Sequence, residues 1–219
     1  MDKPVLHYVT DALCGWCFGF GPVMLKLQEQ YKDKLHVNVI NGGMITGERV
    51  QPISASADYI KNAIPRVVET TGVPFGDAYI EVLEKGTYIN NSFPPAVALA
   101  ILRDAAPQRA LEFAHAIQKA MFVEGKNLND ADTYVELAAS AGLDRDSFME
   151  RYASEHYKNQ ALYEFQVVQQ WGIQGFPVVI MQKKDKMAMA AQGYLPFETL
   201  VQNIDQLLEM DFDAIPVQA

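Results

Sequence analysis

Two cysteines, Cys14 and Cys17, are the residues whose type and spacing point most directly to chemistry. They are the only cysteines among the 219 residues of the chain. Random placement of two cysteines would give this spacing only about once in a hundred cases, so the pair asks for a chemical explanation. A thiolate can attack a disulfide, and a second thiol nearby can resolve the mixed disulfide that forms. The pair therefore predicts a redox-active dithiol, with Cys14 as the nucleophile and Cys17 as the resolving thiol.

The elements around the pair favour that chemistry. Residues 4–10 are rich in β-branched and aromatic side chains and predict a strand, residues 14–31 predict a helix, and residues 35–40 alternate as a second strand does. The pair then lies where the first strand turns into the helix, and the positive end of the helix stabilises a thiolate there. Gly15 and Trp16, between the cysteines, would tune the stability of the dithiol against the disulfide.

The next hundred residues change character after Asn41-Gly42-Gly43. We find no convincing strand in them, and helical periodicity is punctuated by prolines at 65, 74, 94–95 and 107. The clearest apolar stripe is spaced i, i+3, i+4, i+7 and i+11, as a buried helix face requires. Its members are Ala110, Phe113, Ala114, Ile117 and Met121. A second helix, capped by Asp130, is expected to stop at Gly142. Both stripes are interpreted as helix cores rather than as a cofactor-binding bundle.

The last third of the chain returns to a mixed pattern. We expect a helix over residues 155–171, a strand over residues 177–181, a partner strand over residues 187–191 and a helix opened by Pro196. Lys183-Lys184-Asp185-Lys186 is interpreted as a solvated turn between the two strands rather than as an anion-binding patch. Residues 211–219 are expected to form a loose tail.

The predicted order is βαβ, a helical block, then αββα. We therefore predict an α/β thioredoxin fold with a helical domain inserted after the first βαβ unit. The thioredoxin-like domain is discontinuous, with residues 1–45 and 155–210, and the inserted domain comprises residues 46–154.

The composition of the chain limits the classes of molecule that it is expected to bind. The chain is 49% apolar and 21% charged, with a net charge of −9, which disfavours nucleic acid and anionic membranes. No segment approaches the roughly 18 continuous apolar residues of a membrane span. Residues 1–5 show no signal-peptide organisation, so a cytoplasmic protein is expected. We expect a protein or small-molecule thiol or disulfide as partner, and a monomer or weak dimer.

At this point the sequence resembles a known family. Residues 11–17, Asp-Ala-Leu-Cys-Gly-Trp-Cys, together with Gly175-Phe176-Pro177, resemble the DsbA-like branch of the thioredoxin superfamily, which includes DsbA, FrnE-type proteins and 2-hydroxychromene-2-carboxylate isomerases. The resemblance covers nearly the whole chain. It implies that a cis peptide bond precedes Pro177 and that Pro177 lies against the cysteine pair and helps to dock substrate. It further implies substrate contacts from four residues, Gly15, Trp16, Phe18 and Phe176.

One departure from the family bears on redox direction. DsbA has Pro-His between its cysteines, and that histidine favours a stable thiolate and a strongly oxidising protein. This chain has Gly15-Trp16 instead. We therefore expect a reductase or isomerase that acts through the Cys14–Cys17 dithiol and disulfide, with no other cofactor and no metal, and with glutathione as a candidate co-substrate.

Alternatives remain open at several residues. The chain could be a glutathione-dependent isomerase or transferase of the kappa-class type, although such relatives carry serine at the position matching Cys14, or a metal-bridging binding module. Asp11 could cap the helix, which is favoured, or assist proton transfer near Cys17. His7 is expected to be a satisfied core residue. Trp16, Phe18 and Phe20 could belong either to the core or to the rim of an apolar groove.

Overall fold

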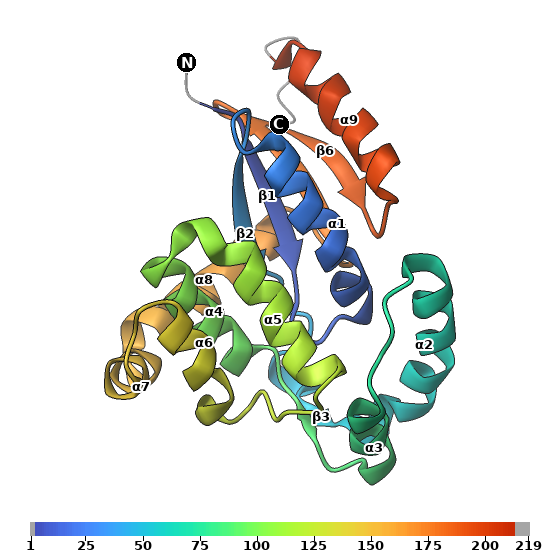
Figure 1. Ribbon diagram of the computed structural model, residues 1–219, viewed down its shortest axis with the longest axis vertical. Helices are drawn as coiled ribbons and strands as arrows, with labels where there is room; N and C mark the ends of the chain where they lie inside the picture. The colour runs from blue at the N-terminus through green and yellow to red at the C-terminus, as the bar shows by residue number, and fades with distance from the viewer. Residues whose placement is uncertain (1–2, 213–219) are drawn as a thin grey trace.

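A four-stranded sheet forms the centre of the fold in the computed structural model, which describes residues 3–212 (Figure 1). The strand order is β2-β1-β5-β6, and only the β1–β2 pair is parallel. The strands are β1 (Val5–Thr10), β2 (His36–Asn41), β5 (Val178–Lys183) and β6 (Lys186–Gln192). The predicted βαβ start and the predicted hairpin at the end are both confirmed, and the turn between β5 and β6 falls at the Lys/Asp run.

Both faces of the sheet are covered, because successive side chains on a strand point to opposite sides. Tyr8 and Val39 face the larger core, against which α1 (Gly15–Tyr31) and α9 (Phe197–Glu209) pack. Val9 and Ile40 face a smaller cluster completed by Val168 near the end of α8 (Glu155–Gln170). The sheet is thereby fixed from both sides, and so is the turn that leads from β1 into α1.

Helices fill the middle of the chain as expected, and they are separated by short 3-10 turns. In order, they are η1 (Gly47–Arg49), η2 (Ile53–Ser56), α2 (Ala57–Thr71), α3 (Asp77–Lys85), α4 (Phe93–Ala105), η3 (Pro107–Arg109), α5 (Ala110–Phe122), η4 (Ala131–Tyr134), α6 (Val135–Ser140) and α7 (Arg145–Ala153). The predicted stripe from Ala110 to Met121 lies on α5 and is buried. Asp130 caps η4 rather than an α-helix, since its side chain accepts from Asp132 N.

Two expectations for this region are wrong. A short antiparallel pair, β3 (Gln51–Pro52) and β4 (Ile89–Asn90), lies within the stretch predicted to contain no strand. Two residues are too few to show an alternating pattern, so the sequence gives no signal for it. Pro65 also fails to end a helix, because it lies inside α2.

The boundaries of the last elements shift slightly. α8 ends at Gln170, one residue before the predicted end, and β5 extends to Lys183 rather than Met181. Pro196 precedes α9 as its N-cap residue. Of the predicted tail, residues 213–219 lie outside the described part of the chain.

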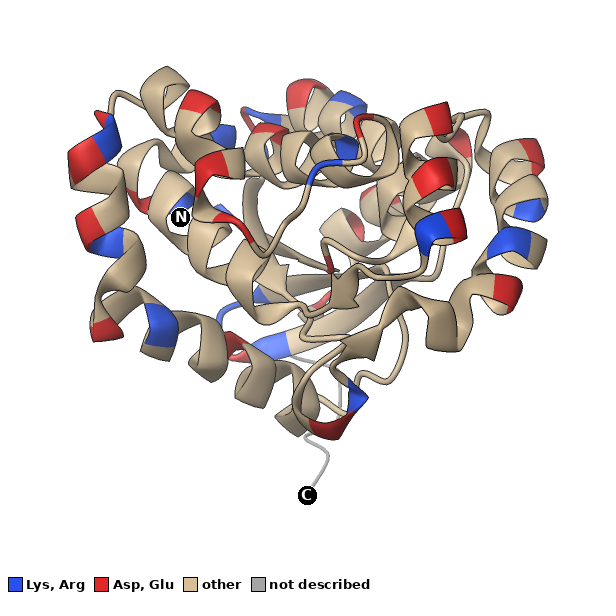
Figure 2. Cartoon of the chain, turned by 90° about the horizontal axis from the view of Figure 1, so that it is seen from below, with Lys and Arg blue, Asp and Glu red and all other residues tan. Residues whose placement is uncertain are grey.

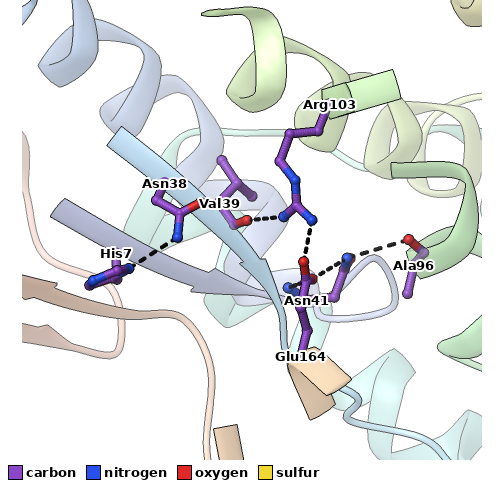
Figure 3. Close-up of polar contacts among 7 residues, drawn as sticks. All are labelled: His7, Asn38, Val39, Asn41, Ala96, Arg103 and Glu164. Carbon is purple, nitrogen blue, oxygen red and sulfur yellow. Dashed lines mark hydrogen bonds and ion pairs between the residues drawn. The ribbon is translucent and has the colours of Figure 1, made fainter. Parts of the chain in front are cut away.

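A buried ion pair ties the helical insertion to the sheet (Figure 3). The Arg103 guanidinium on α4 donates to the Glu164 carboxylate on α8 and to the Val39 carbonyl oxygen on β2. The second Glu164 oxygen accepts from Asn41 N at 2.9 Å and from Asn41 Nδ2 at 2.7 Å. The apolar core runs through both predicted domains, so the division at residues 46 and 154 stays a prediction.

Charges of both signs are interspersed over the helices and turns around the sheet (Figure 2). No helix in the described part of the chain is long and apolar enough to cross a membrane.

Candidate active site

Cys14 occupies the N-cap of α1, so its sulfur lies at the positive end of that helix. Its extended backbone (φ −93°, ψ 110°) turns the side chain back over the first turn, where Sγ accepts from Cys17 N at 3.4 Å. The first N–H groups of a helix lack intrahelical acceptors, and they stabilise negative charge on a neighbouring atom. The sequence thus places the Cys14 sulfur beside the free N–H groups at the start of α1.

The two thiols differ in exposure, and burial changes the pKa of the inner one. Both cysteines are free, so the structure shows the dithiol form. The Cys14 side chain is 6% exposed, whereas Cys17 is fully buried. Burial raises the pKa of the Cys17 thiol well above its usual range, and the hydrogen bond to Cys14 raises that pKa further. Cys17 therefore stays protonated and out of solvent, while Cys14 keeps a small exposed surface.

The segment before β5 lies directly against the nucleophile. The Phe176–Pro177 peptide bond is cis, as the family resemblance implied. The Cys14 thiol donates to the Phe176 carbonyl oxygen across 3.7 Å. The fold thus brings together two residues that are 162 positions apart in the sequence. The Phe176 ring packs where a side chain at Gly42 would be, since a Cβ there would lie 2.4 Å from a ring carbon. Gly42 at the end of β2 thus allows this loop to approach.

A polar group that the sequence analysis missed lies behind Cys17. Gln118 on α5 is 2% exposed, and its Nε2 donates to Thr10 Oγ1 and to the Asp11 carbonyl oxygen, both at 3.1 Å. The Thr10 hydroxyl in turn hydrogen-bonds with the Cys17 thiol, which lowers the pKa of Cys17 against the effect of burial. The sequence did not single out Gln118, because Glu112 and His115 flank the apolar stripe of α5 in the same way.

Asp11 does not cap α1, so the favoured interpretation of this residue is wrong. Cys14 holds that position, and the Asp11 carboxylate instead accepts from Leu13 N at 3.0 Å, Ser92 Oγ at 3.0 Å and Met44 N at 2.8 Å. Asp11 is 3% exposed, and burial raises the pKa of its carboxyl although these hydrogen bonds oppose the rise. The proton-transfer role near Cys17 stays a prediction.

A cavity of about 400 Å³ opens beside Cys14. Gly15 and Trp16 line it, as expected for substrate contacts. Phe18 does not, because it is 2% exposed and packs behind the wall against Phe75 and Phe122. The remaining lining residues come mostly from the helical insertion: Leu13, Met44, Ile45, Arg49, Gln51, Ser56, Tyr59, Ile60, Ala63, Ile64, Val67, Phe75, Tyr79, Asn90, Met121 and Phe122.

Other singled-out residues belong to the core. His7 is 8% exposed, with Nε2 2.6 Å from Gln182 Oε1 and Nδ1 3.1 Å from Asn38 Nδ2 (Figure 3), so the prediction of a satisfied core histidine is confirmed. Phe20 is fully buried. Within residues 3–212, no three or more His, Cys, Asp or Glu side chains gather as a metal site requires.

Comparison with known proteins agrees with this geometry. A sequence profile of the DSBA-like thioredoxin domain matches residues 5–205. A structure from Nitrosomonas europaea, assigned as a protein disulfide isomerase, is 29% identical with a TM-score of 0.84, covering 95% of this chain and 98% of that one. The cytosolic disulfide reductase DsbM from Pseudomonas aeruginosa is 26% identical with a TM-score of 0.75, covering 93% and 98%.

DsbM has also been solved with GSH, and that structure is 25% identical with a TM-score of 0.74, covering 94% of this chain and all of that one. Among curated proteins, the ClpXP adapter protein SpxH of Halalkalibacterium halodurans is 22% identical over 214 residues, covering 94% of this chain and 68% of SpxH. The central sheet, the insertion and the cysteine turn therefore follow an architecture shared with solved relatives.

Proposed function

Because the chain belongs to the DsbA-like family of thiol–disulfide oxidoreductases in the thioredoxin superfamily, we propose that Cys14 and Cys17 form its redox-active pair and that it works as a reductase or isomerase. The observation that carries the proposal is the position of Cys14 Sγ, at the N-terminus of α1 and against the Phe176–Pro177 loop, with Cys17 one turn further in.

The geometry supports a two-step exchange. The Cys14 thiolate attacks one sulfur of a substrate disulfide, the substrate S–S bond breaks, and the departing sulfur takes the electron pair and a proton from solvent. Cys17 then gives up its proton and attacks Cys14 Sγ, which releases the second substrate sulfur as a thiol. The substrate has gained two electrons and two protons, and the protein ends as the Cys14–Cys17 disulfide.

The reducing direction is supported by the residues between the cysteines. Gly15 and Trp16 place no histidine cation beside Cys14. The N-terminus of α1 is then the main group that stabilises a Cys14 thiolate. A less stabilised thiolate makes the dithiol a better electron donor. The relative DsbM, a cytosolic disulfide reductase, favours the same direction and a cytoplasmic location.

A small thiol fits the proposal as the partner that restores the dithiol. Two molecules of such a thiol reduce the Cys14–Cys17 disulfide by the same two steps in reverse, and leave as one small disulfide. The structure of DsbM with GSH supports glutathione as a candidate.

Insulin reduction with dithiothreitol as electron donor tests the function. We expect the wild-type protein to speed the precipitation of insulin chains and Cys14→Ser to remove that effect entirely. Equal activity of Cys14→Ser and wild type would refute the proposal. Mass spectrometry after alkylation checks that the wild-type pair cycles between dithiol and disulfide.

A further inference from the structure

The charge of the cavity beside Cys14 is opposite to that of the chain. The sequence holds 27 acidic and 18 basic side chains, yet no Asp or Glu lines this cavity. Arg49, from η1, is its one charged lining residue within the described chain, and its guanidinium makes no ion pair or hydrogen bond to a described side chain. Arg66 adds a second cation nearby, 6.0 Å over the ring of Trp16. The cavity is therefore suited to an anion.

Two buried polar side chains on the same wall have no protein partner. Asn90 is 5% exposed and Tyr79 is 3% exposed, and both line the cavity. Neither the Asn90 carboxamide nor the Tyr79 hydroxyl makes a hydrogen bond to any residue in the range 3–212. These polar atoms stay accessible from the cavity, since in the described chain only Tyr88 Oη and His115 Nδ1 are buried side-chain polar atoms without a partner. They can therefore bond water, or a ligand that replaces it.

Size and composition describe the occupant further. Much of the remaining wall is apolar, including Ile64, Val67, Phe75, Met121 and Phe122, while Gln51, Ser56 and Tyr59 add polar groups. A volume of about 400 Å³ falls in the range of sites for small molecules and is too small for a folded partner. The Cys14 sulfur lies at one side, so an occupant with its own sulfur could react there.

We propose that this cavity binds a low-molecular-weight thiol that bears a carboxylate and amide groups, with the carboxylate on Arg49, the amides on Asn90 and Tyr79, and the sulfur at Cys14. The inference rests on the proposed function and specifies its small-molecule partner. In the mixed disulfide, the ligand sulfur is bonded to Cys14 Sγ, and the cavity holds the remainder of the molecule.

Arg49 and the two polar residues thereby act on substrate choice rather than on the reactivity of the sulfur. The reaction is the regeneration of the dithiol described above, in which two ligand thiols reduce the Cys14–Cys17 disulfide and leave as one ligand disulfide. Oxidation of the reduced pair by that ligand disulfide is the same two steps in reverse, with two ligand thiols as products.

Single-turnover oxidation of the reduced protein by two small disulfides tests the proposal. Glutathione disulfide carries carboxylates and amides, whereas bis(2-hydroxyethyl) disulfide carries neither. We expect Arg49→Gln to lower the second-order rate constant for glutathione disulfide about fivefold to tenfold, because a charge-assisted hydrogen bond is lost. The rate constant for the neutral disulfide should change less than twofold.

Two further variants and one control complete the design. Asn90→Ala and Tyr79→Phe should each lower the rate constant for glutathione disulfide several-fold and spare the neutral disulfide. Lys32→Gln removes one positive charge at the opposite end of α1 and should leave both rate constants unchanged. Reaction with the neutral disulfide also shows that each variant is folded and that its thiols are active.

The outcomes separate the two proposals. If Arg49→Gln slows both disulfides equally, Arg49 acts on Cys14 and the recognition site is refuted. If it slows neither, the site is also refuted, while the proposed function stands. If the wild-type protein reacts with neither disulfide, the proposed function itself fails.

Discussion

The two sulfurs, only one helical turn apart, have opposite environments. Cys14 lies at the edge of a cavity, whereas Cys17 is fully buried and its pKa is raised. We therefore expect iodoacetamide to label Cys14 at least about tenfold faster than Cys17 in the native reduced protein. Peptide mapping after timed quenching gives both rates. Faster labelling of Cys17 would reverse the assignment of nucleophile and resolving thiol.

The Thr10 hydroxyl affects the second step of exchange. Thr10 Oγ1 accepts the Gln118 amide, so its one O–H is left for the Tyr8 hydroxyl oxygen or the Cys17 sulfur, and we expect it to turn to Cys17 as that sulfur loses its proton. Thr10→Val should slow the resolution of a Cys14 mixed disulfide about threefold to tenfold, because a hydrogen bond to a charged group is lost. Rapid acid quench and mass spectrometry measure this step.

The first attack by Cys14 should be unaffected in Thr10→Val. Thr133→Val, whose hydroxyl bonds the Asn127 carbonyl oxygen far along the chain, serves as the matched control. Equal slowing of both steps in Thr10→Val would indicate a distorted site rather than a specific role.

The residues between the cysteines should set the redox potential. We expect a potential below DsbA's value of about −120 mV, and Trp16→His should raise it by favouring the thiolate. The substitution also removes the ring beneath Arg66, which could not be foreseen from the sequence. Equilibration with glutathione buffers gives both potentials. A wild-type value at or above that of DsbA would contradict the reducing direction.

At the residue scale, the sequence predicted functional residues that lie close together in the chain, and it missed those that the fold brings together from distant segments. Cys14 and Cys17 are found by spacing, and Pro177 by resemblance to a family. Arg49, Tyr79 and Asn90 come from three separate elements, η1, α3 and β4, and no local pattern links them. Phe18 was expected among the substrate contacts, but the sequence left open whether its ring belongs to the core or to a groove rim, and the ring packs in the core.

At the scale of elements, Asp11 joins three segments. Its carboxylate accepts hydrogen bonds from Leu13 N just after β1, from Met44 N after β2 and from Ser92 Oγ before α4. Burial raises its pKa above the usual 3.8. Its contribution to stability is therefore fully present below pH 3.8 and is lost as the pH rises through the folded-state pKa.

The free energy of unfolding of the wild type, relative to Asp11→Asn, should accordingly fall as the pH rises from about 4 to 7. The asparagine variant does not titrate, so the difference isolates this one group. Urea denaturation at four or five pH values measures it. A difference that grows with pH would mean that the hydrogen bonds outweigh burial and that the folded pKa is lowered.

Long elements were predicted well because their patterns repeat over many residues. The sheet strands and helices such as α5 and α9 show a clear period of two or of 3.6. β3 and β4 are too short for any period, and a backbone hydrogen bond of 2.7 Å from Ile53 N to the Tyr88 carbonyl oxygen continues their pairing by one residue on each side. Pro65 lies inside α2 although a proline in a helix interior removes one backbone hydrogen bond.

At the scale of the whole molecule, the Arg103–Glu164 pair connects the insertion to the sheet. The two side chains are 15% and 11% exposed, so removing one charge leaves the other buried without its partner. We expect Glu164→Gln to lower the free energy of unfolding by about 3 kcal/mol. Glu155→Gln, which breaks an exposed pair with Lys158, should cost about 0.5 kcal/mol or less.

Chemical denaturation followed by tryptophan fluorescence measures both values. The double variant Arg103→Met with Glu164→Leu should regain much of the lost stability, since it leaves no buried charge. A loss in Glu164→Gln no larger than in Glu155→Gln would show that the pair is solvated and contributes little.

The cavity beside Cys14 has walls from one part of the chain and a nucleophile from another. Residues 46–154 supply most of its lining, with α2 as the largest contributor, whereas the first turn of α1 and the loop before β5 supply the thiols and Pro177. Substitutions in the insertion can therefore alter which molecules enter without changing how electrons move once they arrive. The residues that select the ligand are therefore separate from the residues that react with it. During evolution, a descendant of this protein could acquire new substrates while its cysteine pair stayed the same.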